Sequence, residues 1–267
     1  MERHRVRPGT TIKLADYDAS DTSAFPGPKA QADAVVAGKS QELNVLQELL
    51  YAEHKHKVLI VLQGMDTSGK DGTIRHVFQH VDPLGVRVGA FKAPSAEEAS
   101  FDYLWRIHRH VPGKGEIVIF NRSHYEDVGI ARVRELVPRQ VWQRRYGQIN
   151  DFERMLTEEG TTILKFYLHI DRNEQRKRLE ARRDDPEKQW KFSRADIEER
   201  KFWPKYMEAY EEAISRTCTE WAPWHIVPAN YKWYRNLVVA SLIVDALSKL
   251  KMKYPKAGDS VEGVDIK

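Results

Sequence analysis

The chain has 267 residues, of which 41% are hydrophobic, and its 43 basic and 39 acidic residues give a formal net charge of +4. This apolar content excludes global disorder, and so small a basic excess does not imply nucleic-acid binding. The single cysteine, Cys218, excludes an intramolecular disulfide or CxxC site. Because there is no secretory signal and no apolar run near the ~20 residues of a membrane span, we expect a cytoplasmic protein without a membrane partner.

Strands and helices are predicted to alternate along most of the chain. Residues 1–30 are polar and contain several prolines and glycines, which indicates an arm lying over the surface. Short apolar runs typical of buried parallel strands occupy residues 57–63, 86–91, 115–123, 161–170 and 224–229. Helical spacing of apolar residues or charged helix-forming sequence predicts helices over residues 29–53, 70–78, 95–108, 138–158, 172–184, 194–216 and 231–251.

This alternation predicts an α/β fold with a five-stranded parallel sheet covered by helices on both faces. No change in composition divides the chain. We therefore expect one domain over residues 31–251, preceded by the arm (1–30) and followed by a tail (252–267).

The stretch GMDTSGKDG, residues 64–72, follows the first predicted strand and precedes a helix. Gly64, Gly69 and Lys70 match the G-x-x-x-x-G-K pattern of a phosphate-binding P-loop, and this is the structural context that the motif requires. Backbone N–H groups and the helix dipole converge on an anion there. An ordinary turn with a solvated lysine is the alternative. The predicted phosphate-binding residues of the loop are Gly64, Thr67, Ser68, Gly69, Lys70, Asp71 and Gly72.

Two carboxylates make this loop unusual. Asp71 stands where a P-loop has the Ser or Thr that binds Mg²⁺, and Asp66 lies inside the loop. A carboxylate beside a phosphate is repelled unless a cation lies between them. We therefore expect Mg²⁺, with Mn²⁺ as a substitute, at one or both acids. Asp66 could instead orient or deprotonate an attacking group. Asp71 could simply be an acidic residue that the helix dipole favours in the first turn.

Polar residues also end the third predicted strand. Asn121 and Arg122 lie at its carboxyl end, where open α/β sheets bind their ligands. Glu126 and Asp127 follow about one helical turn later and could reach a metal or a substrate. The alternative is a helix cap in which Ser123 and Glu126 form a capping box.

Residues 172–183 carry six basic side chains against two acidic ones. Such a charge run is usually a solvated helix face. In a P-loop kinase architecture, however, the segment after the fourth strand is a mobile lid whose arginines close over transferring phosphates. Arg178 and Arg182 share one face of this helix, and Lys188 follows it.

Four motifs in order, GMDTSGKDGT, FNRSHYEDV, LKFYLHI with DPEKQWKFS, and APWHIVPA, resemble the polyphosphate kinase 2 family from about residue 30 to 250. The NRSHYED version resembles its class III branch. This resemblance implies a P-loop kinase-like three-layer α/β/α fold with a helical lid at about 172–200. It also implies Mg²⁺-dependent transfer of phosphoryl groups between inorganic polyphosphate and AMP or ADP, forming ADP and ATP, in a dimer or tetramer.

The resemblance assigns roles by position. Lys70 and Arg122 would stabilise the transferring phosphoryl group, and Asp66 and Asp127 would bind metal or position the nucleophile. The lid residues Arg178, Arg182 and Lys188 would clamp phosphates. Asn121, Arg122 and Glu126 would contact the nucleotide, and we expect Asn121 and Glu126 to tune the use of AMP against ADP. An ATP-dependent small-molecule kinase and a non-catalytic polyphosphate-binding module are the alternatives. Reaction direction, chain length and base preference stay open.

Overall fold

The computed structural model describes residues 1–256 and contains one sheet of five parallel strands. The strands are β1 (Lys57–Gln63), β2 (Val86–Ala90), β3 (Ile117–Asn121), β4 (Thr161–His169) and β5 (Trp224–Pro228). Their order across the sheet is β2-β3-β1-β4-β5. The predicted five-stranded α/β fold is therefore confirmed.

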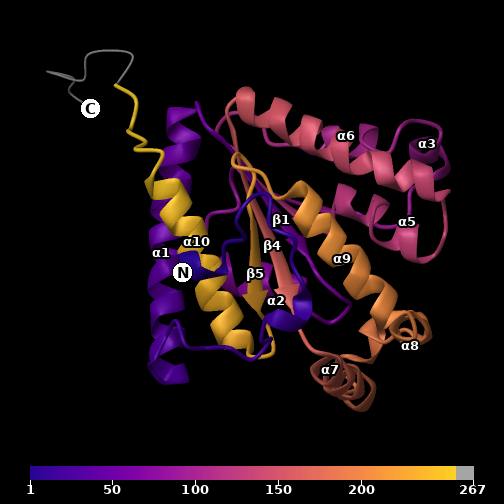
Figure 1. The fold of residues 1–267 in the computed structure, drawn as a ribbon. Coiled ribbons are helices and arrows are strands. Elements are labelled where there is room, and N and C mark those ends of the chain that lie inside the picture. The colour runs from indigo at the N-terminus through magenta and orange to yellow at the C-terminus, as the bar shows by residue number, and fades with distance from the viewer. Residues whose placement is uncertain (257–267) are drawn as a thin grey trace, which may run out of the picture.

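Alternate strand residues face two separate cores, which makes the fold three-layered. On β1, Val58, Ile60 and Leu62 pack under α1 (Lys29–Glu53), α2 (Lys70–Val77) and α10 (Lys232–Ser248). Leu59 and Val61 pack on the other face, under α6 (Arg139–Glu158) and the carboxyl half of α9 (Trp203–Thr217). Figure 1 shows α1 and α10 on one side of the sheet and α6 and α9 on the other. Burying each such aliphatic side chain stabilises the folded state by about 1.5–3 kcal/mol relative to leaving it exposed to water.

The carboxyl ends of the strands share one edge of the sheet. The register pairs Leu62 of β1 with Asn121 of β3 and Gln63 with Tyr167 of β4, so the segments that follow β1 and β3 begin side by side. Beyond this edge lie α7 (Arg172–Asp184) and α8 (Arg194–Arg200), next to the strand arrowheads in Figure 1. The fold thus brings three separate sequence motifs to one end of the sheet.

Two predicted helices are interrupted. The Ser95–Glu98 capping box forms, but α3 ends after one turn (Ala96–Ala99), and α4 (Trp105–His108) begins anew because Asp102 accepts hydrogen bonds from the N–H groups of Leu104 and Trp105. The helix predicted over 194–216 splits into α8 and α9, and Pro204 occupies the first turn of α9, where a proline is tolerated.

The N-terminal arm contributes to the core. Val6, Ile12 and Leu14 are buried, and the N–H of Val6 donates to Trp224 O of β5 at 2.8 Å. Five shorter elements complete the description: η1 (Glu2–His4), η2 (Leu14–Asp16), η3 (His124–Asp127), α5 (Ile130–Val133) and η4 (Gln189–Lys191).

The boundaries of arm, domain and tail stay predictions, and the tail lies outside the described residues from 257 onward. Within residues 1–256, no helix combines the length and the apolar character needed to cross a bilayer.

Candidate functional site

The predicted P-loop connects β1 to α2 through a backbone that needs its glycines. Gly64 has φ 147°, and a Cβ there would lie 2.7 Å from Leu168 O and 2.8 Å from Ser68 Oγ. Thr67 also lies in the left-handed region, with φ 66°. Non-glycine residues in that region are strained and concentrate at functional sites.

Lys70 curls back into the loop. Its side chain is buried, and Nζ donates hydrogen bonds to Gly64 O at 2.8 Å and to Met65 O at 3.3 Å. Burial lowers the pKa of Lys70, while the nearby carboxylates of Asp66 and Glu126 favour the charged form. The loop thus encloses an ammonium group beside the start of α2, where an anion would meet both the lysine charge and the helix dipole.

Arg122 meets Asp66 across the ends of β3 and β1. Arg122 Nη2 lies 2.7 Å from Asp66 Oδ1, and the guanidinium remains 40% exposed. Arg122 has φ 64°, and its N–H donates to Leu62 O at 3.2 Å. Burial opposes the charge of Arg122, but Glu126 and Asp66 raise its pKa above the ordinary value. The strained backbone therefore presents a permanent cation beside the loop.

Asp71 is also bound by the neighbouring strand. Asn121 Nδ2 donates to Asp71 Oδ1 at 2.7 Å, and Lys191 Nζ lies 3.8 Å from Asp71 Oδ2. Burial disfavours the ionised form, but the Asn121 hydrogen bond and the lysine charge outweigh it and hold the pKa of Asp71 below its ordinary value. Asp71 is therefore an anion that both β3 and the lid contact.

Glu126 lies close to Lys70 and Arg122. Burial raises its pKa, against the opposing effects of Arg122 and Lys70. In the amide orientation that satisfies both of its polar atoms, the Gln63 side chain donates to Glu126 Oε1 at 3.0 Å and accepts from Ser123 N at 3.0 Å. The Ser123 hydroxyl accepts from the N–H of Tyr125, so it caps η3 through a different residue than a Ser123–Glu126 capping box would use.

Asp127 lies in other surroundings. Its Oδ1 is 3.3 Å from Arg145 Nη1, and its Oδ2 is 4.0 Å from Arg106 Nη2. Burial raises the pKa of Asp127, opposed by Arg145 and Arg106. The structure does not show Asp127 in contact with Asp66, and residues 1–256 contain no group of three metal-ligating side chains. A metal-binding role for Asp127 stays a prediction.

Asp66 and Asp71 fit a hard divalent cation better. Such cations prefer carboxylate oxygens, and the two side chains keep 27% and 61% of their surface exposed beside the loop. A cation held there would neutralise the repulsion between these acids and a bound phosphate.

Arg178 binds the loop itself. Its Nη1 donates to Thr67 O at 2.9 Å and to Ser68 O at 3.0 Å, and its Nη2 donates to Ala229 O and Asn230 O at 2.6 and 2.9 Å. Its Nε pairs with Glu174 at 2.7 Å. The predicted phosphate clamp thus joins the lid, the loop and the end of β5.

The other two predicted lid residues are more open. Arg182 Nη1 lies 3.6 Å from Asp196 Oδ2, and Arg182 is 27% exposed. Lys188 is 60% exposed and pairs with Asp185. Because the charges of Arg182, Arg122 and Lys70 all act on Asp196, Arg182 lies near the other two cations, whereas Lys188 lies on the lid surface.

Several side chains at the site had no recognisable role in the sequence. Gln175 Nε2 donates to Asp66 O at 3.2 Å, and Lys191 reaches Asp71. Burial and the charge of Asp66 raise the pKa of Asp196. Arg235, in the closing helix, contacts Ser68 O. Only the three-dimensional positions distinguish these residues from other polar side chains.

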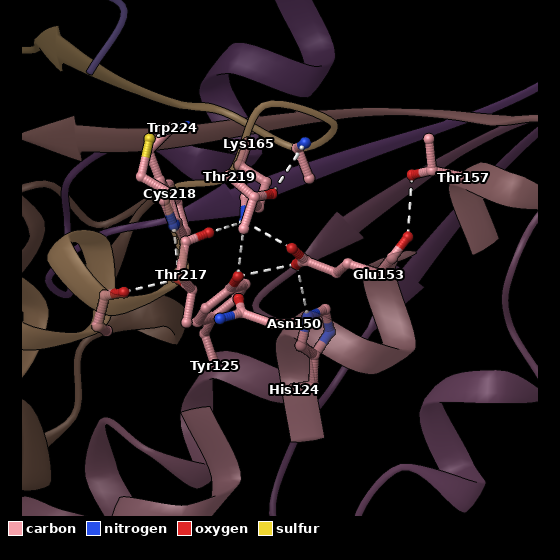
Figure 2. Close-up of polar contacts among 12 residues, drawn as sticks. His124, Tyr125, Asn150, Glu153, Thr157, Lys165, Thr217, Cys218, Thr219 and Trp224 are labelled. Atoms are coloured by element: carbon pink, nitrogen blue, oxygen red, sulfur yellow. Dashed lines mark hydrogen bonds and ion pairs between the residues drawn. The ribbon is translucent and has the colours of Figure 1, made fainter. Parts of the chain in front are cut away.

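A buried polar network holds η3, the turn that carries Glu126 and Asp127 (Figure 2). Glu153 Oε1 accepts from Tyr125 Oη at 2.8 Å and contacts His124 Nε2 at 3.1 Å. Lys165 Nζ donates to Glu153 Oε2 at 2.6 Å, to Tyr125 Oη at 2.8 Å and to Thr217 O at 2.7 Å. Lys165 and Glu153 are fully buried. Lys165, Glu153 and the Tyr125 hydroxyl are all hydrogen-bonded within this network, which holds the turn against β4 and α6, while His124 Nδ1 is buried without a partner.

Comparisons with known proteins show which proteins the chain resembles. A family model described as "Polyphosphate kinase 2 (PPK2)" matches residues 28–255. A protein of Meiothermus ruber named "AMP/ADP-polyphosphate phosphotransferase" is 55% identical over 266 residues, 100% of both chains. An "ADP-polyphosphate phosphotransferase" of Rhodopseudomonas palustris is 42% identical, covering 96% of this chain and 92% of the relative. The crystal structure of polyphosphate kinase 2 from Arthrobacter aurescens TC1 matches this structure with a TM-score of 0.94 at 48% identity. The match covers 97% of this chain and 93% of the Arthrobacter chain.

Proposed function

The chain belongs to the polyphosphate kinase 2 family, and on that premise we propose that it transfers phosphoryl groups between inorganic polyphosphate and AMP or ADP, forming ADP and ATP. The observation that carries this proposal is the convergence of Lys70 and Arg122, from adjacent strand ends, with the carboxylates of Asp66 and Glu126. The names of the relatives support the substrates.

In this proposal the protein acts through position and charge. Phosphoryl transfer requires little covalent chemistry from the enzyme, because its transition state spreads negative charge over the transferred group. Lys70 and Arg122 stabilise that charge from two sides of the loop. Arg182 adds a lid cation, and Arg178 holds the loop carbonyls in place.

Mg²⁺, for which Mn²⁺ could substitute, completes the proposed site. Asp66 would hold it, together with Asp71 or, as predicted from the family, Asp127. When bound, the ion neutralises charge on the phosphate chain and so allows acids to stand beside it.

Asn121, Arg122 and Glu126 are the proposed nucleotide contacts. Asn121 binds Asp71 and Glu126 faces Arg122, so a change at either position alters charge beside the acceptor phosphate. We expect Asn121→Asp and Glu126→Asn to change the ratio of AMP to ADP turnover. An unchanged ratio in both variants would remove this assignment.

The proposal also includes a cytoplasmic setting and a homo-oligomer, without nucleic-acid or membrane partners. A reducing compartment suits the chain's single cysteine. Val45 and Tyr51 of α1 are 54% and 51% exposed and could contribute to a contact between copies. Light scattering of the purified protein measures the assembly directly.

Phosphorus NMR tests the proposed activity. Polyphosphate, Mg²⁺ and AMP are incubated with the wild-type protein, with Lys70→Ala and with Lys249→Ala, which removes an exposed lysine at the far end of α10. We expect ADP and ATP signals with the wild type and Lys249→Ala and none on the same timescale with Lys70→Ala. Parallel samples with ATP as the donor to a small-molecule acceptor test the alternative kinase. Binding of polyphosphate without any turnover would favour a non-catalytic module.

A further inference from the structure

A second buried guanidinium lies behind the P-loop. Arg235 of α10 is only 2% exposed, and its Nη1 donates to Ser68 O at 3.3 Å. It lies so close to Gly69 that a Cβ at that position would overlap its Nη1. Arg178 reaches Ser68 O from the lid, so two arginines from distant helices hold one carbonyl.

Arg235 differs from the buried cations Lys165 and Arg178 in its partners. Its Nε and Nη2 donate to the neutral amide oxygen of Asn236 at 3.2 and 2.8 Å. Among the residues that the structure describes, no carboxylate forms an ion pair with it, whereas Lys165 is paired with Glu153 and Arg178 with Glu174. Burial and the charge of Arg178 lower the pKa of Arg235 to about 9, so it is still a cation at neutral pH.

The contact with Ser68 O also orients the loop. In a trans peptide the C=O and the following N–H point in opposite directions. When the arginines hold Ser68 O on their side, the N–H of Gly69 points away from them. That N–H is one of the donors that a P-loop directs at a bound phosphate.

We propose that Arg235 is a positioning residue of the phosphate loop and that a bound polyphosphate supplies the counter-charge it lacks within the protein. The positive charge of Arg235 attracts the polyphosphate anion bound on the other side of the loop. Its hydrogen bond to Ser68 O fixes the direction of the Gly69 N–H. An unpaired buried charge is costly in the free protein, and this cost falls when an anion binds. The inference rests on the proposed function, because it assigns Arg235 to the same site.

Four proteins test the inference: the wild type, Arg235→Met, Arg235→Lys and Lys249→Met. The last removes the same charge from an exposed position at the other end of α10. Steady-state kinetics with polyphosphate and ADP are combined with thermal unfolding in the absence and presence of polyphosphate. We expect Arg235→Met to raise KM for polyphosphate about tenfold, as for the loss of one partly screened charge interaction, with a much smaller change in kcat.

The thermal data separate positioning from a merely structural role. Arg235→Met should melt at or above the wild-type temperature without ligand, because a buried unpaired charge is removed, and should gain less from polyphosphate. Arg235→Lys should be intermediate, and Lys249→Met should behave as wild type. A folded Arg235→Met with wild-type KM and wild-type stabilisation by polyphosphate overturns the inference, as does a lowered melting temperature with unchanged kinetics.

If Arg235→Met does not fold, Arg235→Gln takes its place in the same comparison, since its amide can still donate to Ser68 O. A wild-type protein that neither turns over nor is stabilised by polyphosphate would refute the proposed function itself. A wild type that does both, beside an Arg235 variant that matches it, would refute only the role of Arg235.

Discussion

Glu126 shows how single residues at this site are held away from their ordinary ionisation. It lies close to Lys70 and Arg122, yet the effect of burial outweighs that of both cations and raises its pKa above 4.5. Arg122 and Thr67 are unusual in backbone rather than charge, since both adopt positive φ. Such departures persist only where the surrounding structure enforces them, which is typical of functional sites.

The raised pKa of Glu126 predicts a pH dependence of stability. A carboxyl group with a raised folded-state pKa contributes stability below its unfolded value of 4.5 and loses that contribution as pH rises through the folded pKa. Glu126→Gln removes this loss. We expect the variant to gain melting temperature relative to the wild type at pH 7, and the gain to shrink toward pH 4.5. Thermal unfolding across this range measures it, and a gain independent of pH would contradict the assignment.

At the scale of elements, two segments place side chains around the P-loop: the turn η3 and the lid. The buried pair Lys165–Glu153 joins η3 to α6 and β4. The lid helix α7 is tied to the loop by Arg178 and Gln175. One segment is therefore fixed by a buried ion pair and the other by hydrogen bonds to backbone carbonyls.

Removing one member of the buried pair should be strongly destabilising. Lys165→Met leaves Glu153 as an unpaired buried charge, which costs about 3–5 kcal/mol in the free energy of unfolding. Urea unfolding measures this loss. Arg154→Met is the control, because its partner Asp151 on the same helix is exposed and such pairs contribute about 0–1 kcal/mol. Equal losses in both variants would show that the buried network does not stabilise the fold.

Arg182 provides a test of the lid. It lies beside Asp196 near the centre, so we expect Arg182→Gln to lower turnover by roughly tenfold or more through loss of a cation near the transferring group. Arg183→Gln is the matched control, since Arg183 is exposed on the same helix and pairs with Asp184. The initial rate of ATP formation distinguishes them. Comparable rates in the two variants would assign Arg182 to the solvated surface.

The sequence predicted the elements well where the pattern was local. The bounds of α1, β1 and α7 agree with the predicted residues 29–53, 57–63 and 172–184, because continuous apolar runs and helical spacing are local signals. The breaks near Asp102 and Pro204 depend on single turns that those patterns do not reveal. In the site, the motifs located Lys70 and Arg122. The carbonyl partners of Arg178 could not be predicted, since they come from segments 50 or more residues away.

At the scale of the whole molecule, we expect a divalent cation to be needed for catalysis but not for the stability of the fold. Residues 1–256 contain no cluster of three metal-ligating side chains. The catalytic proposal, in contrast, needs a divalent ion beside Asp66.

Chelation should therefore separate activity from stability. With excess EDTA we expect turnover of polyphosphate and ADP to be lost, the melting temperature without ligand to stay unchanged, and activity to return when Mg²⁺ or Mn²⁺ is added. Undiminished turnover in the chelator would contradict the proposed site. A large fall in melting temperature would instead indicate a metal that holds the fold together.

The N-terminal arm has a consequence for solubility. β5 ends the sheet, and an uncovered outer strand offers free N–H and C=O groups to any other extended chain. Arg5 forms an antiparallel bridge with His225, Val6 N–H occupies Trp224 O, and Cys218 Sγ contacts Val6 O at 3.3 Å. The first residues thus cover part of the outer edge of β5 and hinder edge-to-edge aggregation. We therefore expect a chain without these residues to keep every residue of the proposed catalytic site and still to precipitate.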